Sequence, residues 1–538
     1  MRTELLITVE PEEEKNQNII EKKILQQLDK KNIRAKKEEI TYVIEKKSID
    51  ARHRKIKIIL KYRVFINETP DDNEKLPEWK QADEKKRVVI VGTGPAGLYA
   101  AFRLLEDGIK PILVDRGTDA ESRKKDIELI RNEGILNANS NYCFGEGGAG
   151  TFSDGKLYTR SNKRGDIRKI HRIFTEFGAS KSILTDAHPH IGTDKLPGII
   201  SGMRKKILEK GGEFHFDSLC TDLIVEKSSA GKKFRAAGVK VQNVRTGEKS
   251  EIRGEKVILA TGHSAADIYK IISRISPESL EAKTFAVGVR VEHPRALIDS
   301  IQFHGKAMQQ AAEYRLTAQS GERGVYSFCM CPGGFVVPCA TAENQIVVNG
   351  MSASGRNSRW SNSAIVVERK PEDIPEDFRK QAESDGCPAL AGLYWRTWLE
   401  EETFRHADGQ KAPAQRLTDF LAHKDSKNLP ESSYKPGLSV SRLDNWLPRE
   451  ISTRLSEAFK SFDKSMSGFV CDDAILIASE TRTSTPVRIL RDKETLECLG
   501  IEGLYPCGEG SGYSGGIGSS AMDGERAASM VCRSFKKS

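Results

Sequence analysis

The stretch from Arg87 to Asp115 constrains the fold of this chain more than any other part of the sequence. It begins with an apolar run typical of a buried strand, and it continues through Gly92-Thr-Gly-Pro-Ala-Gly97 into a helical pattern. A second apolar run then ends at Asp115. A strand, a glycine turn, a helix and a strand that ends in a carboxylate form the unit that holds the pyrophosphate and ribose of a dinucleotide. We therefore expect an α/β, Rossmann-like domain here.

Each glycine of this turn has a separate task. Gly92 permits the tight turn, Gly94 lets the backbone approach phosphates, and Gly97 lets the helix pack closely on the strand. A proline suits the first helical turn, where free N–H groups and the positive helix end face an anion. From this unit we predict cofactor contacts at Gly92, Gly94, Pro95, Ala96, Gly97, Asp115 and Arg116.

The same glycine spacing occurs twice more, at residues 145–150 and 510–515. Neither copy follows an apolar strand or precedes a strand that ends in an acid. Only the first copy therefore has the context that the dinucleotide motif requires.

Length and composition limit the number of domains and the classes of protein to which this chain can belong. At 538 residues the chain exceeds the roughly 250–300 at which a single core stops growing, so we expect two or three domains. The net charge of +9 is compatible with a phosphorylated cofactor and too dilute to indicate nucleic-acid binding by itself. The ten cysteines are scattered, and we find no signal-peptide layout and no membrane-spanning run. We expect a soluble cytoplasmic protein without a membrane partner.

Four segments follow from the pattern of apolar residues. Residues 1–80 predict a small α+β module, and a polar linker is expected over residues 68–86. Residues 87–282 predict the first part of the cofactor domain, 283–480 an inserted α+β substrate or cap domain, and 481–538 the return to the cofactor domain. Basic residues alternate along the strand at 56–66, which is typical of a solvated sheet face and leaves RNA binding as an alternative.

Three further segments carry small residues suited to close contact with a cofactor. The first is the glycine-rich loop from Asn141 to Lys156, the second ends the strand at residues 256–262, and the third is the glycine loop and helix at residues 504–528. In these segments we predict cofactor contacts at Gly147, Gly148, Thr151, Ala260, Thr261, Gly262, Gly508, Glu509, Gly516 and Ile517.

Together, Gly92 to Gly97 with Asp115, Val257 to Gly262, and Gly503 to Glu509 resemble the FAD-contacting motifs of glutathione-reductase-type flavoproteins. The nearest resemblance is to an uncharacterised family of NAD(P)/FAD-dependent dehydrogenases with an N-terminal α+β module. Shorter stretches also resemble that family, namely Ser48 to Arg52, Cys331 to Gly334 and Asn349 to Ser352.

This resemblance implies FAD as the cofactor. The glycines of the first turn would bind its pyrophosphate and Asp115 its adenosine ribose, although many relatives carry glutamate at that place. Gly508 and Glu509 would lie by the ribityl and pyrophosphate groups. The helix that follows Gly516 would direct its N-terminus at the pyrimidine ring of the flavin, where a positive helix end favours the reduced form.

The stretch from Glu480 to Arg488 directly precedes the last cofactor segment. We predict Arg482 as a catalytic residue that fixes a substrate carboxylate or stabilises negative charge on the flavin, with Glu480 orienting it. A salt-bridged strand edge is the alternative for the same residues.

The cysteines and histidines are interpreted mainly as structural residues. The loop at 141–156 offers only Cys143, which argues against dithiol chemistry and leaves a single charge-transfer thiol as an alternative. Cys329, Cys331 and Cys339 are interpreted as buried small side chains, and no metal is expected because no fourth ligand is evident. His188 and His190 are interpreted as structural, with catalysis as the alternative.

The predicted function is FAD-dependent hydride transfer to or from an unidentified small molecule. NAD(P)H would be a transient donor, because residues 151–500 contain no second dinucleotide motif. The alternatives are an RNA-associated flavoprotein that uses the basic N-terminal module and a flavin redox sensor without turnover. Substrate, electron acceptor and oligomeric state stay open.

Overall fold

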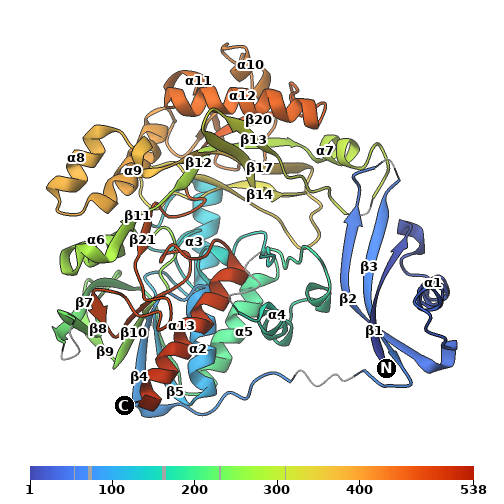
Figure 1. The fold of residues 1–538 in the computed structure, drawn as a ribbon. Coiled ribbons are helices and arrows are strands. Elements are labelled where there is room, and N and C mark those ends of the chain that lie inside the picture. Colours follow the sequence, from blue (N-terminus) through green and yellow to red (C-terminus); the bar gives the residue numbers. More distant parts are fainter. Residues whose placement is uncertain (54, 71–74, 160–164, 229–231, 309, 538) are drawn as a thin grey trace.

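The computed structural model describes residues 1–53, 55–70, 75–159, 165–228, 232–308 and 310–537. A small N-terminal module lies to one side of a larger body (Figure 1). In that body a Rossmann-like domain carries a second domain built on a large mixed sheet. No helix among the described residues has the length and apolar character needed to cross a bilayer. The α/β fold with an FAD-binding-type domain is as the sequence predicts.

The N-terminal module is a three-stranded antiparallel sheet with one covering helix. The sheet order is β1 (Arg2–Val9), β3 (Lys57–Ile66) and β2 (Ile40–Asp50), and α1 (Gln17–Lys30) packs against it. The strict alternation of apolar residues in β3 puts every second side chain into the core under α1. Asn16 caps α1 by accepting a hydrogen bond from the N–H of Ile19 at 3.3 Å.

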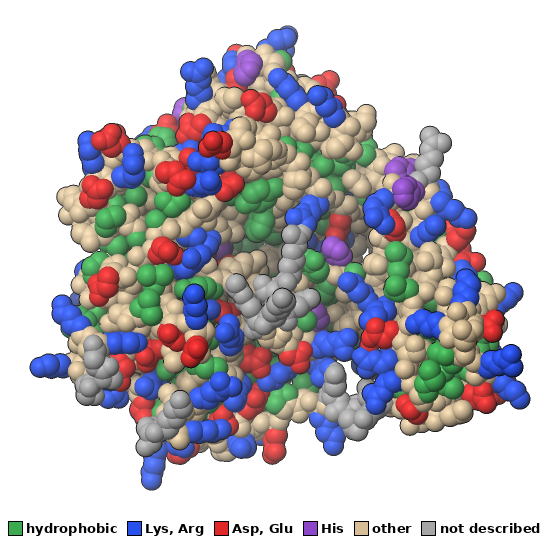
Figure 2. Space-filling model, in the orientation of Figure 1, with side chains coloured by type: hydrophobic (Ala, Val, Ile, Leu, Met, Phe, Trp, Pro, Cys, Tyr) green, Lys and Arg blue, Asp and Glu red, His purple; other side chains and the backbone are tan. Residues whose placement is uncertain are grey.

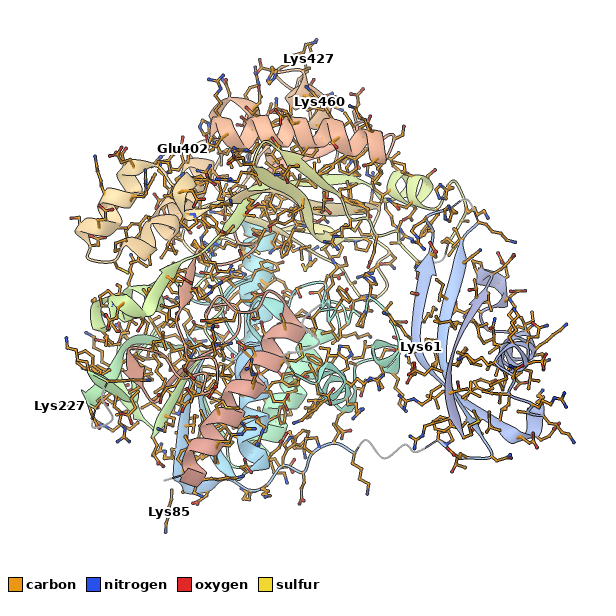
Figure 3. The ribbon with its side chains drawn as sticks, viewed as in Figure 1. Lys61, Lys85, Lys227, Glu402, Lys427 and Lys460 are labelled. Atoms are coloured by element: carbon orange, nitrogen blue, oxygen red, sulfur yellow. The ribbon has the colours of Figure 1, made fainter. Side chains whose placement is uncertain are left out.

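The module contacts the larger body through backbone hydrogen bonds at the edge of β2. The N–H of Lys47 donates to the carbonyl of Thr185 at 2.8 Å, and the N–H of Ala187 donates to the carbonyl of Lys47 at 2.8 Å. Lys61, labelled on this sheet in Figure 3, forms ion pairs with Glu4 and Glu45. Lysines and arginines are interspersed with acidic side chains over the face of the module that Figure 2 shows.

The Rossmann-like domain is built on a five-stranded parallel sheet. Its order is β6 (Glu213–His215), β5 (Ile109–Val114), β4 (Asp83–Val91), β10 (Lys256–Leu259) and β23 (Leu504–Pro506). A second, mostly antiparallel sheet contains β7 (Ser218–Lys227), β8 (Phe234–Asn243), β9 (Lys249–Arg253) and β22 (Ile501–Glu502). The helices of this domain are α2 (Pro95–Glu106), α3 (Ala120–Glu133), α4 (Ile167–Glu176), α5 (Leu196–Glu209), α6 (Ala266–Ile275) and α13 (Ile517–Lys537).

The first strand of this domain starts earlier than expected. We placed a linker over residues 68–86, but β4 begins at Asp83, which pairs with Ile109 of β5. The polar start of the strand is tolerated because it projects beyond the core, with a register shift before Arg87. Residues 71–74 of the predicted linker lie outside the described residues.

The second domain is built on a seven-stranded sheet. Its order is β13 (Thr317–Ser320), β14 (Arg323–Cys331), β17 (Trp360–Arg369), β12 (Phe285–Pro294), β20 (Ile475–Glu480), β18 (Ala412–Arg416) and β19 (Leu438–Val440). A separate hairpin joins β15 (Phe335–Pro338) and β16 (Val348–Met351). Its helices are α7 (Arg295–Gln302), α8 (Glu376–Ser384), α9 (Ala391–Arg405), α10 (Leu417–Leu421), α11 (Leu443–Trp446) and α12 (Arg449–Ser465), and α12 crosses the top of the sheet in Figure 1.

Two short strands carry the chain into and out of this second domain. The outgoing strand β11 (Leu280–Ala282) pairs antiparallel with the returning strand β21 (Val487–Ile489). The N–H of Lys283 donates to the carbonyl of Pro486 at 2.8 Å, which extends this pairing toward the second domain. The crossing point therefore brings residues near 480 back to the edge of the Rossmann-like domain.

Candidate functional site

A cavity of about 350 Å³ lies between the Rossmann-like domain and the seven-stranded-sheet domain. All four sequence segments with predicted cofactor contacts reach it. Of the predicted residues, its lining contains Gly92, Gly94, Pro95, Ala96, Asp115, Arg116, Gly148, Ala260, Thr261, Gly262, Gly508, Glu509, Gly516, Ile517 and Arg482. Four predicted residues stand outside the lining: Gly97, Gly147, Thr151 and Glu480.

The turn between β4 and α2 has no room for a side chain at Gly92 or Gly97. A Cβ atom on Gly92, whose φ is +102°, would lie 2.4 Å from the carbonyl oxygen of Ala260. One on Gly148 would lie 3.1 Å from the Cα of Gly94, so the glycine-rich loop packs directly over the turn. Gly97 lies behind the cavity and holds α2 against this turn, because its own Cβ would lie 2.0 Å from the carbonyl oxygen of Gly92. The glycines therefore expose backbone rather than side chains to the cavity.

Two helices begin at the cavity. Pro95 opens α2, Ile517 opens α13, and both line the cavity. The helices pack closely, because a Cβ on Gly524 of α13 would lie 2.0 Å from the carbonyl oxygen of Ala96. Gly516 has a φ of +151° and open space where its Cβ would be. Two helix N-termini at one cavity favour a ligand with negative charge.

Asp115 is held by the protein on both carboxylate oxygens. Oδ2 accepts hydrogen bonds from the N–H and the hydroxyl of Thr93 at 3.0 and 2.6 Å. Oδ1 accepts from the N–H groups of Gly117 and Gly145 at 3.0 and 3.1 Å. Four donors match the four lone-pair sites of a carboxylate. In this structure Asp115 ties the strand end to the glycine turn and the glycine-rich loop, and a ribose hydroxyl would have to share one of these sites.

The glycine-rich loop is clamped by a residue that the sequence did not single out. Arg123 of α3 is fully buried, and it donates to the backbone carbonyls of Asn141, Gly145 and Glu146 at 2.9, 3.2 and 2.7 Å. Thr151 also faces this loop, because its hydroxyl donates to the carbonyl of Glu146 at 2.8 Å. Thr151, like Gly147, therefore shapes the loop from behind the cavity wall. No local pattern in α3 distinguishes Arg123 from its exposed basic neighbours.

Arg482 is buried on the cavity wall, and its carboxylate partner is Glu400 of α9. Its Nε and Nη2 donate to Glu400 at 2.9 and 2.7 Å, and Nη2 also donates to Gln345 at 3.2 Å. The prediction that Glu480 orients Arg482 is wrong. Glu480 lies inside the seven-stranded sheet and accepts from Nε of Arg290 at 2.9 Å. Glu480 is the last residue of β20, and the chain leaves the sheet there. Glu480 and Arg482 are therefore only two residues apart but have different partners.

Of the three cysteines interpreted as buried small side chains, Cys331 and Cys339 are buried and Cys329 is half-buried. Cys143, Cys329 and Cys339 line the cavity, whereas Cys331 is fully buried behind it. Cys329 has a φ of +45° at an irregularity in β14, and the thiol of Cys331 donates to its carbonyl at 3.2 Å. Cys143 does not stand alone, because its Sγ lies 3.5 Å from the backbone carbonyl of Cys339.

Neither His188 nor His190, the two histidines singled out in the sequence, belongs to the cavity lining. His188 stacks on Tyr158, a cavity-lining residue, with ring centroids 4.9 Å apart. His190 lies 3.2 Å from the carbonyl oxygen of Ser354 through its Nε2. Within the described residues, no group of three or more His, Cys, Asp or Glu side chains is arranged to hold a metal ion.

Glu509 and His263 form a polar corner of the cavity, with 3.7 Å between the carboxylate and Nε2. Burial raises the pKa of Glu509 to about 7. Burial also lowers the pKa of His263 to about 3, so the imidazole stays neutral near physiological pH. The hydroxyl of Ser264 lies 2.9 Å from Nδ1 of that ring.

Family comparisons agree with this geometry. Residues 85–130 match the family described as FAD binding domain, and residues 284–483 match the family described as FAD-dependent protein, C-terminal domain-like. Residues 1–65 match a domain of unknown function. An uncharacterized protein of Clostridium beijerinckii is 39% identical over 459 residues, which cover 84% of this chain and 81% of that protein.

The chain is an FAD-binding flavoprotein and belongs to the family of that clostridial protein. Among solved structures, a flavoprotein/dehydrogenase from Cytophaga hutchinsonii matches 84% of this flavoprotein and 79% of its own chain, at 9% identity and a TM-score of 0.37. A geranylgeranyl bacteriochlorophyll reductase-like structure from Thermoplasma acidophilum matches with the same coverage and TM-score at 11% identity. The THI4 structure from Thermovibrio ammonificans matches 36% of this chain and 62% of its own, at 16% identity and a TM-score of 0.25.

The cavity of the flavoprotein fits FAD. A Cβ on Gly92 would collide with the backbone carbonyl of Ala260, and one on Gly148 would press on Gly94, whereas one on Gly94 would meet only ordinary contacts from 3.7 Å. These glycines leave the backbone of the turn uncovered for close contact with a pyrophosphate. The N-termini of α2 and α13 would both face anionic or electron-rich parts of the cofactor. When bound, FAD supplies two-electron redox chemistry in this cavity.

Proposed function

We propose that this flavoprotein is an oxidoreductase of the glutathione-reductase-type superfamily that transfers a hydride between a small-molecule substrate and FAD. The observation that carries the proposal is the two-sided cavity. The cofactor segments form one wall, and Phe328, Cys329 and Asn349 of the seven-stranded-sheet domain form the other. A concave, largely apolar site with a few polar groups is the usual form of a small-molecule site.

Arg482 is the proposed charge-stabilising group. Glu400 fixes its guanidinium through two hydrogen bonds, so the positive charge stays on the cavity wall without reorganisation. The N-terminus of α13 adds positive potential to the same space. Both features favour negative charge that develops in the cavity. The RNA-associated alternative draws no support from the interspersed charges on the module face in Figure 2.

NAD(P)H is the proposed electron donor, and it would enter the cavity transiently. Across the described ranges, one strand–glycine turn–helix–strand unit of the dinucleotide type is present, from β4 to β5, and we assign it to FAD. The donor would therefore share the open side of the cavity, near Tyr158 and Lys156, with the substrate.

Anaerobic flavin reduction tests this function. The FAD-loaded protein is mixed with NADH, NADPH and a panel of alcohols, amines and carboxylates, and the visible flavin absorbance is followed. We expect one donor to bleach the flavin, and we expect Phe328→Ala to slow that reduction. Tyr326→Ala is the matched control, because Tyr326 packs on the same strand and apolar cluster but stands outside the cavity lining.

Two outcomes would count against the proposal. A flavin that binds normally and stays oxidised with every donor would favour a redox sensor without turnover. Equal slowing by Phe328→Ala and Tyr326→Ala would show that the substrate does not use the wall formed by β14.

A further inference from the structure

The side-chain amide of Asn349 lies on the cavity wall, and the residues behind it fix its orientation. Its Oδ1 accepts hydrogen bonds from Nη2 of Arg290 at 3.1 Å and from the N–H of Gly350 at 2.7 Å. A guanidinium and a backbone N–H can only donate, so the oxygen of the amide must face them. The NH₂ group of Asn349 therefore points away from Arg290, and within the described part of the chain it donates to no protein group.

The arginine behind this amide is itself held firmly. Arg290 of β12 is fully buried, and its Nε donates to Glu480 at 2.9 Å while its Nη1 donates to Asn362 at 2.7 Å. Glu480 and Asn362 belong to β20 and β17, the two strands that flank β12. Gly350 leaves room for the guanidinium, because a Cβ there would lie 2.3 Å from Nη1 of Arg290. The pair Asn349-Gly350 thus presents one oriented amide in front of a buried cation.

Lys156 of the glycine-rich loop brings a second donor to the same cavity. Its Nζ donates to the carbonyl of Met330 and lies 3.5 Å from Oδ2 of Asp154. Nη1 of Arg290 donates to the carbonyl of Cys329, the preceding residue, at 3.4 Å. Lys156 and the arginine behind Asn349 therefore contact consecutive carbonyls of β14. An ammonium group has three N–H donors, so one donor of Lys156 is left for a ligand.

The charges around Lys156 favour an anionic ligand. Asp154 is almost fully buried, and its Oδ2 also accepts from Nη2 of Arg356 at 2.9 Å. One buried carboxylate is therefore shared by two cations. The other carboxylate that pairs with Arg356 is Glu313, whose side chain is 35% exposed, so water and salt screen its charge more strongly. Positive potential remains at this part of the cavity wall.

We propose that Asn349 and Lys156 bind the carboxylate of the substrate, which makes small carboxylic acids the substrate class of this flavoprotein. The amide of Asn349 donates to one carboxylate oxygen, and the ammonium of Lys156 supplies a second donor and the opposite charge. The reaction that follows rests on the proposed function, whereas the binding of the acid does not. Arg482 keeps its proposed role as the group that stabilises negative charge in the cavity.

Ligand binding to the oxidised, FAD-loaded protein tests this assignment without any turnover. Acetate, propanoate and benzoate are titrated, each beside its primary amide, and the shift of the visible flavin absorbance gives the dissociation constants. We expect each carboxylate to bind about tenfold or more tightly than its uncharged amide. Because no hydride is transferred, this result stands even if no donor reduces the flavin.

Variants identify the groups that bind the acid. Asn349→Asp keeps the shape of the side chain and an oxygen toward Arg290, but it replaces the donor by a second oxygen. It should weaken carboxylate binding by about tenfold or more, and Lys156→Met should do the same. Asn344→Asp is the matched control, because Asn344 is exposed in the same β15–β16 hairpin and stands outside the cavity lining.

Three results would overturn the proposal. The first is that the carboxylates bind no more tightly than their amides. The second is that Asn349→Asp and Lys156→Met both bind carboxylates as tightly as Asn344→Asp does. The third is a loss of FAD affinity in Asn349→Asp with unchanged carboxylate affinity of the loaded variant, which would assign the amide to the cofactor instead.

Discussion

Gly97→Ala and Gly198→Ala make the same chemical change in two helices and should have opposite effects. Alanine at a helical position gains up to about 1 kcal/mol over glycine. Gly198 of α5 has no atom within 4 Å of its would-be Cβ, so it should keep that gain. At Gly97 of α2 the Cβ would lie 2.0 Å from the backbone carbonyl oxygen of Gly92 and 3.3 Å from Cγ2 of Ile90.

The backbone carbonyl cannot rotate aside as a flexible side chain could. The helix must therefore move away from the glycine turn, at an overpacking cost of about 1–3 kcal/mol that exceeds the helical gain. Because Gly92 and Gly94 line the cavity, this movement should also weaken FAD binding by about tenfold or more, equivalent to about 1.4 kcal/mol.

Flavin fluorescence titration of the cofactor-free protein measures the affinity, and thermal melting measures the stability. Gly198→Ala should bind FAD like the unaltered protein and melt at the same or a slightly higher temperature. If Gly97→Ala binds FAD within a factor of about two of the unaltered protein and melts like Gly198→Ala, the reasoning from the close approach of α2 is refuted.

Three further predictions concern other parts of the molecule. Glu400→Gln should lower the free energy of unfolding in urea by about 3–5 kcal/mol, because it leaves Arg482 buried without its counter-charge. Glu402→Gln on the same helix (Figure 3) should lower it by only about 0–1 kcal/mol. Similar losses for the two variants would show that the buried pair does not contribute more than the more exposed one. Burial raises the pKa of Glu509 to about 7, so the folded state binds this proton more tightly than the unfolded chain. The free energy of unfolding should therefore fall between about pH 5 and about pH 8, and more steeply in the unaltered protein than in Glu509→Gln. Equal slopes would assign this pH dependence to other groups. A chain that starts at residue 75 should retain FAD, because the cavity lining begins at Val91, and loss of flavin absorbance would show that the N-terminal module supports the site.

Much of the fold follows from local patterns. The alternating residues of β3 and the apolar runs of β4 and β5 report which faces are buried, and the glycine turn reports a close backbone approach. The prediction of FAD is confirmed by the family matches at 85–130 and 284–483. The predicted roles of individual residues toward the cofactor and substrate stay predictions.

Partners across the molecule were harder to predict. The carboxylate that holds Arg482 lies 82 residues away at Glu400, and the arginine that neutralises Glu480 lies 190 residues away at Arg290. A pattern of period two or 3.6 shows that a side chain is buried and gives no information about which element faces it.

The sequence by itself determined the glycine turn that we predict to anchor the cofactor, because the left-handed turn at Gly92 and the close approach at Gly97 are requirements of the local backbone that glycine meets. Only the tertiary structure decided which groups meet around the cavity. Buried charges and thiols pair with whatever lies nearest in space. The glycine-rich loop, the segment after β15 and Arg482 line the same cavity, and Glu400 of α9 contacts Arg482 there. That arrangement is why Arg482 lies beside Glu400 and Cys143, and why Cys143 has Cys339 as a neighbour.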